Sequence, residues 1–141
     1  MEKERMDMLH KELYIIQLII GRMQNNSFVL KVCTISLITV LLAFTTVKFV
    51  LLFLLFFFWY LDAYYLHKER CYLKLYDWVI VNRNDSDEYL YSLDYKRFEK
   101  EVPSIFDIMF EGLLLFFYGC IVLIVLFLAF YNLTNVVSIK L

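Results

Sequence analysis

Three long apolar blocks constrain this chain more than any other feature of its sequence. They cover residues 28–47, 49–66 and 108–131, and the third contains Glu111 as its single charge. A helix rises about 1.5 Å per residue, so about 20 apolar residues cross a hydrocarbon layer about 30 Å thick. Three glycines and one proline in 141 residues favour long helices over strands. The chain is therefore predicted to be an all-α integral membrane protein with three transmembrane helices.

The first two blocks form either a tight hairpin of two spans or one long helix. One helix over residues 28–61 would be about 50 Å long, which exceeds the thickness of the hydrocarbon layer. Against a hairpin, the intervening Thr45, Thr46 and Lys48 offer neither glycine nor proline for a turn. The hairpin is favoured, because three spans leave all the basic residues up to Lys31 and between Lys68 and Lys100 on one side of the membrane.

The same charge bias predicts the orientation and the layout of the chain. Basic residues stay in the cytoplasm, so the N-terminus is expected on the cytoplasmic side of the membrane and the C-terminus on the opposite side. The predicted segments are an amphipathic N-terminal helix (1–27), the transmembrane hairpin (28–66), a cytoplasmic stalk and loop (67–107), the third transmembrane helix (108–131) and a short C-terminal tail (132–141).

An apolar stripe with three- and four-residue spacing runs along the predicted N-terminal helix. It consists of Met6, Leu9, Leu13, Ile16, Ile20 and Met23. Such a stripe lies in the headgroup plane, packs on the cytoplasmic end of the hairpin, or joins subunits by meeting its own copy. Asn25, Asn26 and Ser27 are expected to interrupt the helix before the first span.

The stalk is predicted to continue the helix of the second span as far as Val81. The polar run at 82–88 is interpreted as its terminating loop, and alternating aromatic residues over 89–95 indicate at most one short strand. Ser104 and Asp107 match a capping box, which is expected to begin the third transmembrane helix.

Charged side chains gather at the predicted inner face of the membrane. They are Arg22, Lys31, Asp62, Glu69, Arg70, Asp77 and Glu111. Charges beside hydrocarbon are costly, so they are expected to be paired or functional. Lys31 begins the first span and Asp62 ends the second, so these two are expected to pair. The layer either fixes the helices by ordinary salt bridges or has a function, as a charged vestibule or as a face that a cytosolic trigger recognises.

Two glycines of the third block, Gly112 and Gly119, lie seven residues apart and therefore share one helical face. Small residues on one face permit the close approach of another transmembrane helix. This spacing is a weak indication of helix association, because no GxxxG pattern is present.

Catalytic, metal and cofactor chemistry is not expected. His10 and His67 are taken to have no Cys or His at ligand spacing, and neither a phosphate-binding glycine loop nor a nucleophile motif is found. The three cysteines are scattered and fit neither a disulfide framework nor a zinc site. A net charge of -1 argues against nucleic acid as a partner. The lipid bilayer is the expected partner.

Short strings across most of the chain resemble small uncharacterised bacterial multi-pass membrane proteins. The strings are Arg22-Met23, Asn26-Ser27-Phe28 with Lys31, residues 58–66, Glu69-Arg70, Leu75-Tyr76-Asp77, Val102-Pro103-Ser104 and Phe117-Tyr118-Gly119. The chain departs from that group at Val32-Cys33, where a glycine-tryptophan pair is usual, and in its short 45–48 turn. In size and layout these proteins are similar to the transmembrane effectors of antiphage defence systems.

The resemblance and the small soluble part together suggest two functions. The first is a homo-oligomeric inner-membrane effector that forms a pore or depolarises the membrane when a cytosolic signal reaches it. The alternative is a non-conducting anchor or assembly subunit that holds a cytosolic partner through residues 62–107. Architecture alone does not decide between them.

Overall fold

The computed structural model describes residues 2–44, 49–83 and 91–140. Every regular element in these ranges is helical: α1 (Glu2–Phe44), α2 (Val50–Asn82), the 3-10 helix η1 (Tyr95–Glu101), α3 (Ile105–Met109) and α4 (Gly112–Lys140). Three of them, α1, α2 and α4, are long and apolar enough to cross a membrane. The prediction of an all-helical chain with three such helices is confirmed.

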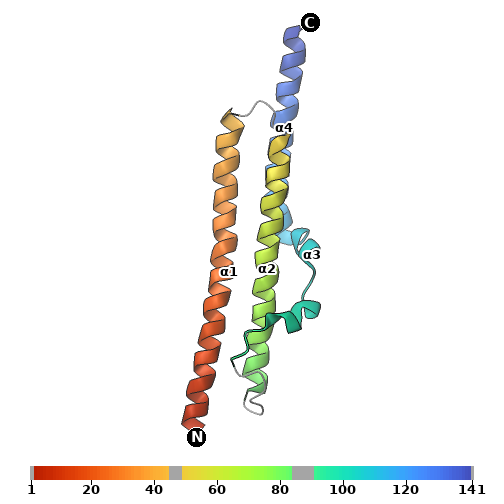
Figure 1. Cartoon of the computed structure of the whole chain (residues 1–141). Helices are drawn as coiled ribbons and strands as arrows, with labels where there is room; N and C mark the ends of the chain where they lie inside the picture. The colour runs from red at the N-terminus through yellow and green to blue at the C-terminus, as the bar shows by residue number, and fades with distance from the viewer. Residues whose placement is uncertain (1, 45–48, 84–90, 141) are drawn as a thin grey trace.

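The first two apolar blocks belong to two antiparallel helices, so a single long helix is ruled out. α1 and α2 lie side by side along most of their length. α4 begins beside the middle of α2 and runs antiparallel to it (Figure 1). The predicted turn at 45–48 lies outside the described residues. The ends of the chain lie at opposite ends of the molecule (Figure 1). We call residues 67–82 of α2, together with η1, the stalk.

The predicted interruption at residues 25–27 is wrong, because α1 continues through it without a break. The predicted N-terminal helix and the first span are therefore one helix of 43 residues. Ser27 is buried and bonds to a carboxylate of α2 in place of capping a helix. Tertiary contacts of this kind outweigh the modest intrinsic cost of Asn and Ser inside a helix.

The third apolar block is broken where a continuous helix was predicted. The capping box at Ser104 and Asp107 is present, but it begins the short α3, which ends at Met109. α4 begins at Gly112, whose φ of +23° suits glycine better than residues with a Cβ. The predicted tail is also corrected, because α4 extends as far as Lys140.

The predicted strand is absent from the part of that segment that the structure describes. Residues 91–94 are irregular, and η1 begins at Tyr95. Asp94 caps η1 by accepting a hydrogen bond from the backbone N–H of Lys96. Residues 84–90, which include the start of the predicted strand, lie outside the described ranges.

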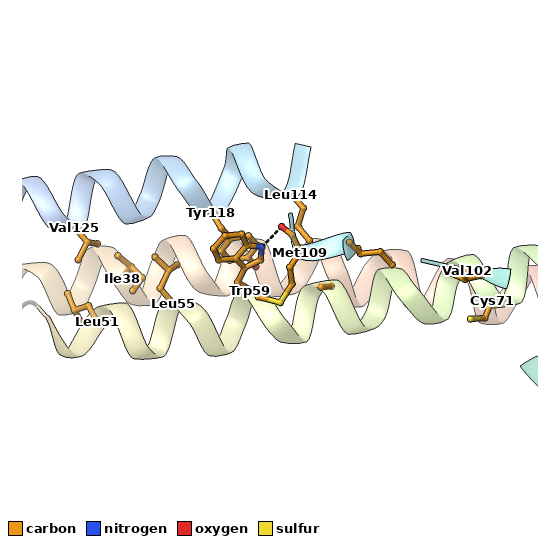
Figure 2. Close-up of a cluster of buried hydrophobic side chains, with 12 residues drawn as sticks. Ile38, Leu51, Leu55, Trp59, Cys71, Val102, Met109, Leu114, Tyr118 and Val125 are labelled. Atoms are coloured by element: carbon orange, nitrogen blue, oxygen red, sulfur yellow. Dashed lines mark hydrogen bonds between the residues drawn. The ribbon is translucent and has the colours of Figure 1, made fainter. Parts of the chain in front are cut away.

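Two apolar clusters hold the helices together. In the upper one, Ile38 of α1, Leu55 of α2 and Val125 of α4 meet between the three long helices (Figure 2). In the lower one, Ile16 and Ile20 of α1 pack against the stalk. The buried Asp62 of α2 lies among the members of the upper cluster, between Trp59 and Ala63, and it is the centre of the candidate site.

Candidate functional site

Asp62 of α2 is the centre of a polar cluster that joins the three long helices. Its side chain is fully buried. One carboxylate oxygen, Oδ1, accepts a hydrogen bond from Ser27, and the other, Oδ2, lies 2.7 Å from Nζ of Lys31. From α4, the hydroxyl of Tyr118 donates to Oδ2 at 3.2 Å. The expected pair of Lys31 and Asp62 is therefore confirmed, and it lies where all three helices meet.

Helical spacing explains how α1 supplies two groups to this cluster. Ser27 and Lys31 are four residues apart and share one face, and Nζ of Lys31 donates to the Ser27 hydroxyl at 2.7 Å. Sequence reasoning did not select Ser27 or Tyr118. The position of Ser27 one turn before Lys31, a lysine within an apolar block, is a signal that would have pointed to it.

Aromatic packing fixes Tyr118 in this position. Its ring stacks on the indole of Trp59 with a centroid separation of 5.7 Å and an interplanar angle of 8°. The indole N–H of Trp59 donates to the carbonyl oxygen of Met109 at 3.0 Å (Figure 2). This carbonyl belongs to the end of α3, so Trp59 connects the helix break to the polar cluster.

Among the described residues, the other charges predicted at the inner face do not form one connected network with Lys31 and Asp62. Arg70 pairs with Glu111 at 2.6 Å, and Glu69 accepts a hydrogen bond from Gln24 at 2.9 Å. Arg22 and Asp77 are exposed, and within the described ranges no ion pair connects either of them to the other five.

A cavity of about 360 Å³ lies next to the Lys31–Asp62 and Arg70–Glu111 ion pairs. Its charged wall is formed by Lys31, Arg70 and Glu111, and its apolar wall includes Leu66, Ile108 and Leu113. The cavity lies at the break between α3 and α4, so all three long helices and α3 contribute to it. We call it the membrane-side cavity.

A second buried ion pair lies near the far end of the stalk and was missed by sequence reasoning. Nε and Nη2 of Arg83 contact the two carboxylate oxygens of Glu12 at 2.8 Å and 2.6 Å, and both side chains are at most 3% exposed. The backbone N–H of Tyr91 donates to Glu12 at 3.2 Å. Arg83 was interpreted as part of a solvated loop. The available signal was Glu12, a charge on the same helical face as Leu9 and Ile16.

The predicted oligomer stripe is partly used inside the chain. Ile16 and Ile20 are buried against Leu75, Val79 and Phe98, and Leu9 and Leu13 border the same cluster. These four side chains therefore pack on the stalk of their own chain. The other two residues differ, because Met6 is exposed and Met23 is half-buried.

Neither predicted packing glycine is approached closely within the described chain. A Cβ built at Gly112 or Gly119 would meet nothing within 4 Å. Gly112 begins α4 with its positive φ, and a Cβ at Gly119 would face open space.

One statement about ligand spacing is wrong. His67 and Cys71 are one helical turn apart, and Nε2 of His67 lies 3.7 Å from Sγ of Cys71. Burial raises the pKa of the Cys71 thiol, which keeps it protonated and weakly reactive at neutral pH. Among the described residues, no group of three His, Cys, Asp or Glu side chains is placed to hold a metal ion.

No protein-family model, no curated protein and no solved structure matches the chain. Its function is therefore inferred from its own residues and their arrangement.

Proposed function

We propose that the protein is a homo-oligomeric inner-membrane effector that permeabilises or depolarises the membrane when its cytoplasmic part is engaged. The carrying observation is the Lys31–Asp62 pair, with Tyr118, at the meeting point of three helices that are long and apolar enough to cross a membrane. Ionisable groups among membrane helices are expensive and commonly mark ion pathways or switches. Antiphage defence is the setting suggested by the resemblance in layout.

The continuity of α2 supplies a route from signal to membrane. This helix runs without a break from Asp62 to Asn82, a distance of about 30 Å along its axis. A shift of the stalk therefore moves Asp62 relative to Lys31 and Tyr118 on the neighbouring helices. Separating these partners would expose polar groups between the spans, which is the opening step that we propose.

Several copies are needed for such an opening, since the described residues of one chain form only three helices that are long and apolar enough to cross a membrane. Both α1 and α4 carry large apolar side chains that are exposed in the single chain: Phe28, Ile35, Val40, Phe116, Leu123 and Phe127. In the proposed assembly these faces meet neighbouring subunits or lipid. The positions of the basic residues support a cytoplasmic stalk and N-terminus in this proposal.

The test is a membrane-potential measurement in bacteria that express the chain and its operon during phage infection. We expect the wild type to depolarise the cells. Asp62→Asn should depolarise the cells severalfold more than the wild type before infection, because it removes the partner of Lys31 and so weakens the contact whose separation is the proposed opening step. Asp7→Asn is the matched control, since Asp7 is an exposed aspartate of α1 that lines neither the cavity nor the stalk pocket. Cells that keep their potential and viability while the wild type is present in the membrane would refute the proposal.

The second candidate is a non-conducting anchor for a cytosolic protein. It is favoured by an open pocket of about 210 Å³ on the stalk, lined by Arg70, Leu73, Lys74, Asp77, Glu101 and Pro103. This pocket combines both signs of charge with apolar surface, as protein-binding surfaces often do. It lies on the segment that was expected to hold a partner.

The two candidates differ in the particle that a mild detergent should extract. A ring of identical subunits favours the pore, whereas a single membrane chain with a stoichiometric cytosolic protein favours the anchor. The mass of the purified particle, after subtraction of detergent, distinguishes these outcomes.

A further inference from the structure

We propose that the membrane-side cavity binds the headgroup of a zwitterionic phospholipid that carries a primary ammonium, such as phosphatidylethanolamine. Lys31 belongs both to this cavity and to the proposed opening step, but lipid binding is measured without depolarisation, so the two proposals are tested separately. It goes beyond general contact with the bilayer, because it assigns one lipid class to named side chains.

The cavity lies at the depth of the lipid headgroups. Lys31 is near the start of the first apolar block, Leu66 ends the second, and Gly112 begins the apolar α4, so all three mark one edge of the hydrocarbon layer. Its volume of about 360 Å³ falls in the range of small-molecule sites. A headgroup can reach the cavity, since Arg70, Glu111 and Leu113 in its wall are 35%, 53% and 82% exposed.

The charged wall matches both charges of such a headgroup. Lys31 and Arg70 are cations that suit a phosphate, and Glu111 is an anion that suits an ammonium group. The contact between Arg70 and Glu111 joins Nη2 to Oε2, and Oε1 of the carboxylate can accept from the lipid ammonium. The two side chains remain 35% and 53% exposed, so they are accessible to a ligand.

The apolar surroundings fit the rest of the lipid molecule. Leu113 is 82% exposed at the mouth of the cavity, and Phe116 and Leu123 continue an exposed apolar path along α4. An acyl chain that leaves the headgroup in this direction runs along the helix into the hydrocarbon layer. Lys31 and Arg70 then bracket the phosphate at the membrane surface.

The test uses native mass spectrometry of the full-length protein, exchanged into mixed micelles with equal amounts of phosphatidylethanolamine, phosphatidylcholine and phosphatidylglycerol. We expect the wild type to retain phosphatidylethanolamine about tenfold better than phosphatidylcholine, whose quaternary ammonium cannot donate a hydrogen bond to Glu111. Glu111→Gln should lose this discrimination, and Arg70→Ala should weaken the retention of every phosphate-bearing lipid. Lys74→Ala, a basic side chain one turn along α2 that does not line this cavity, should leave the retention unchanged.

Three outcomes would overturn the proposal. They are equal retention of all three lipids by the wild type, a preference for phosphatidylglycerol, and unchanged discrimination in Glu111→Gln. The comparison of lipids on the wild type does not require any variant to fold. If the wild type depolarises cells but shows no lipid preference, this site alone is overturned. If the wild type prefers phosphatidylethanolamine but does not depolarise cells, only the proposed function is overturned.

Discussion

Burial distinguishes two of the ion pairs in the described part of the chain. Glu12 and Arg83 are at most 3% exposed and share a bidentate contact, whereas Arg70 and Glu111 are 35% and 53% exposed. When one partner of a buried pair is removed, the charge of the other partner remains in a medium that solvates it poorly. An exposed pair loses little, because water replaces the missing partner. The buried pair should therefore dominate the stability of the stalk.

Replacement of Arg83 by alanine tests this difference. We expect Arg83→Ala to lower the free energy of unfolding by about 3–5 kcal/mol, since Glu12 is left buried without its partner. Arg70→Ala should cost at most about 1 kcal/mol. The measurement is unfolding in mixed micelles with increasing denaturing detergent, followed by far-ultraviolet circular dichroism.

A double variant provides the control for this experiment. Glu12→Leu with Arg83→Met removes both charges, so it should be more stable than either single substitution. Similar unfolding curves for Arg83→Ala and the wild type would show that the pair contributes nothing to stability.

The candidate site could be predicted from the sequence only in part, for reasons visible in single residues. Lys31 and Asp62 were paired correctly because both lie at the edge of an apolar block, so their depth follows from the hairpin. Tyr118 lies inside an apolar helix, and nothing local distinguishes it from an ordinary core aromatic residue. Arg83 follows a helix in a polar run, and only Glu12 on the facing helix makes it a buried residue.

At the scale of elements, the helices end where tertiary contacts dictate. The Asn-Asn-Ser sequence at 25–27 predicted a break that α1 does not have, because its neighbour α2 satisfies Ser27. The break between Met109 and Gly112 was not predicted, since Phe110 and Glu111 show no turn signal beyond the adjacent glycine. The exact ends of helices are commonly less predictable than their existence.

The indole of Trp59 is expected to stabilise that break. Trp59→Phe keeps an aromatic ring beside Tyr118 but removes the donor to the Met109 carbonyl, which is then left unsatisfied among buried side chains. We expect a loss of about 1–3 kcal/mol in the free energy of unfolding. The same detergent titration measures it.

Phe53→Leu is the matched control, because Phe53 lies on the same helix and is 81% exposed. It should change stability by less than about 0.5 kcal/mol. If Trp59→Phe changed stability as little as this control, the hydrogen bond to Met109 would not stabilise the break between α3 and α4.

At the scale of the whole molecule, three apolar blocks and the positions of the basic residues were enough to predict the up-down-up arrangement of the long helices (Figure 1). The length of α1 was not predictable from these features. Its 43 residues extend over about 65 Å, roughly twice the hydrocarbon thickness, because its N-terminal half packs on the stalk. Contacts between distant segments, rather than local propensity, make this helix continuous.

The topology that we infer from this arrangement predicts which sites are accessible from outside the cell. In a background with Cys33, Cys71 and Cys120 changed to alanine, we expect Asn132→Cys to react with a membrane-impermeant maleimide on intact cells. Lys100→Cys should react only after the membrane is opened, because η1 and the stalk lie on the side of the basic residues. Both native positions are exposed in the structure, so burial does not explain a difference between them. Labelling of Lys100→Cys on intact cells would reverse the inferred orientation and place the stalk beyond the reach of any cytosolic signal, which would contradict the proposed effector and the proposed anchor alike.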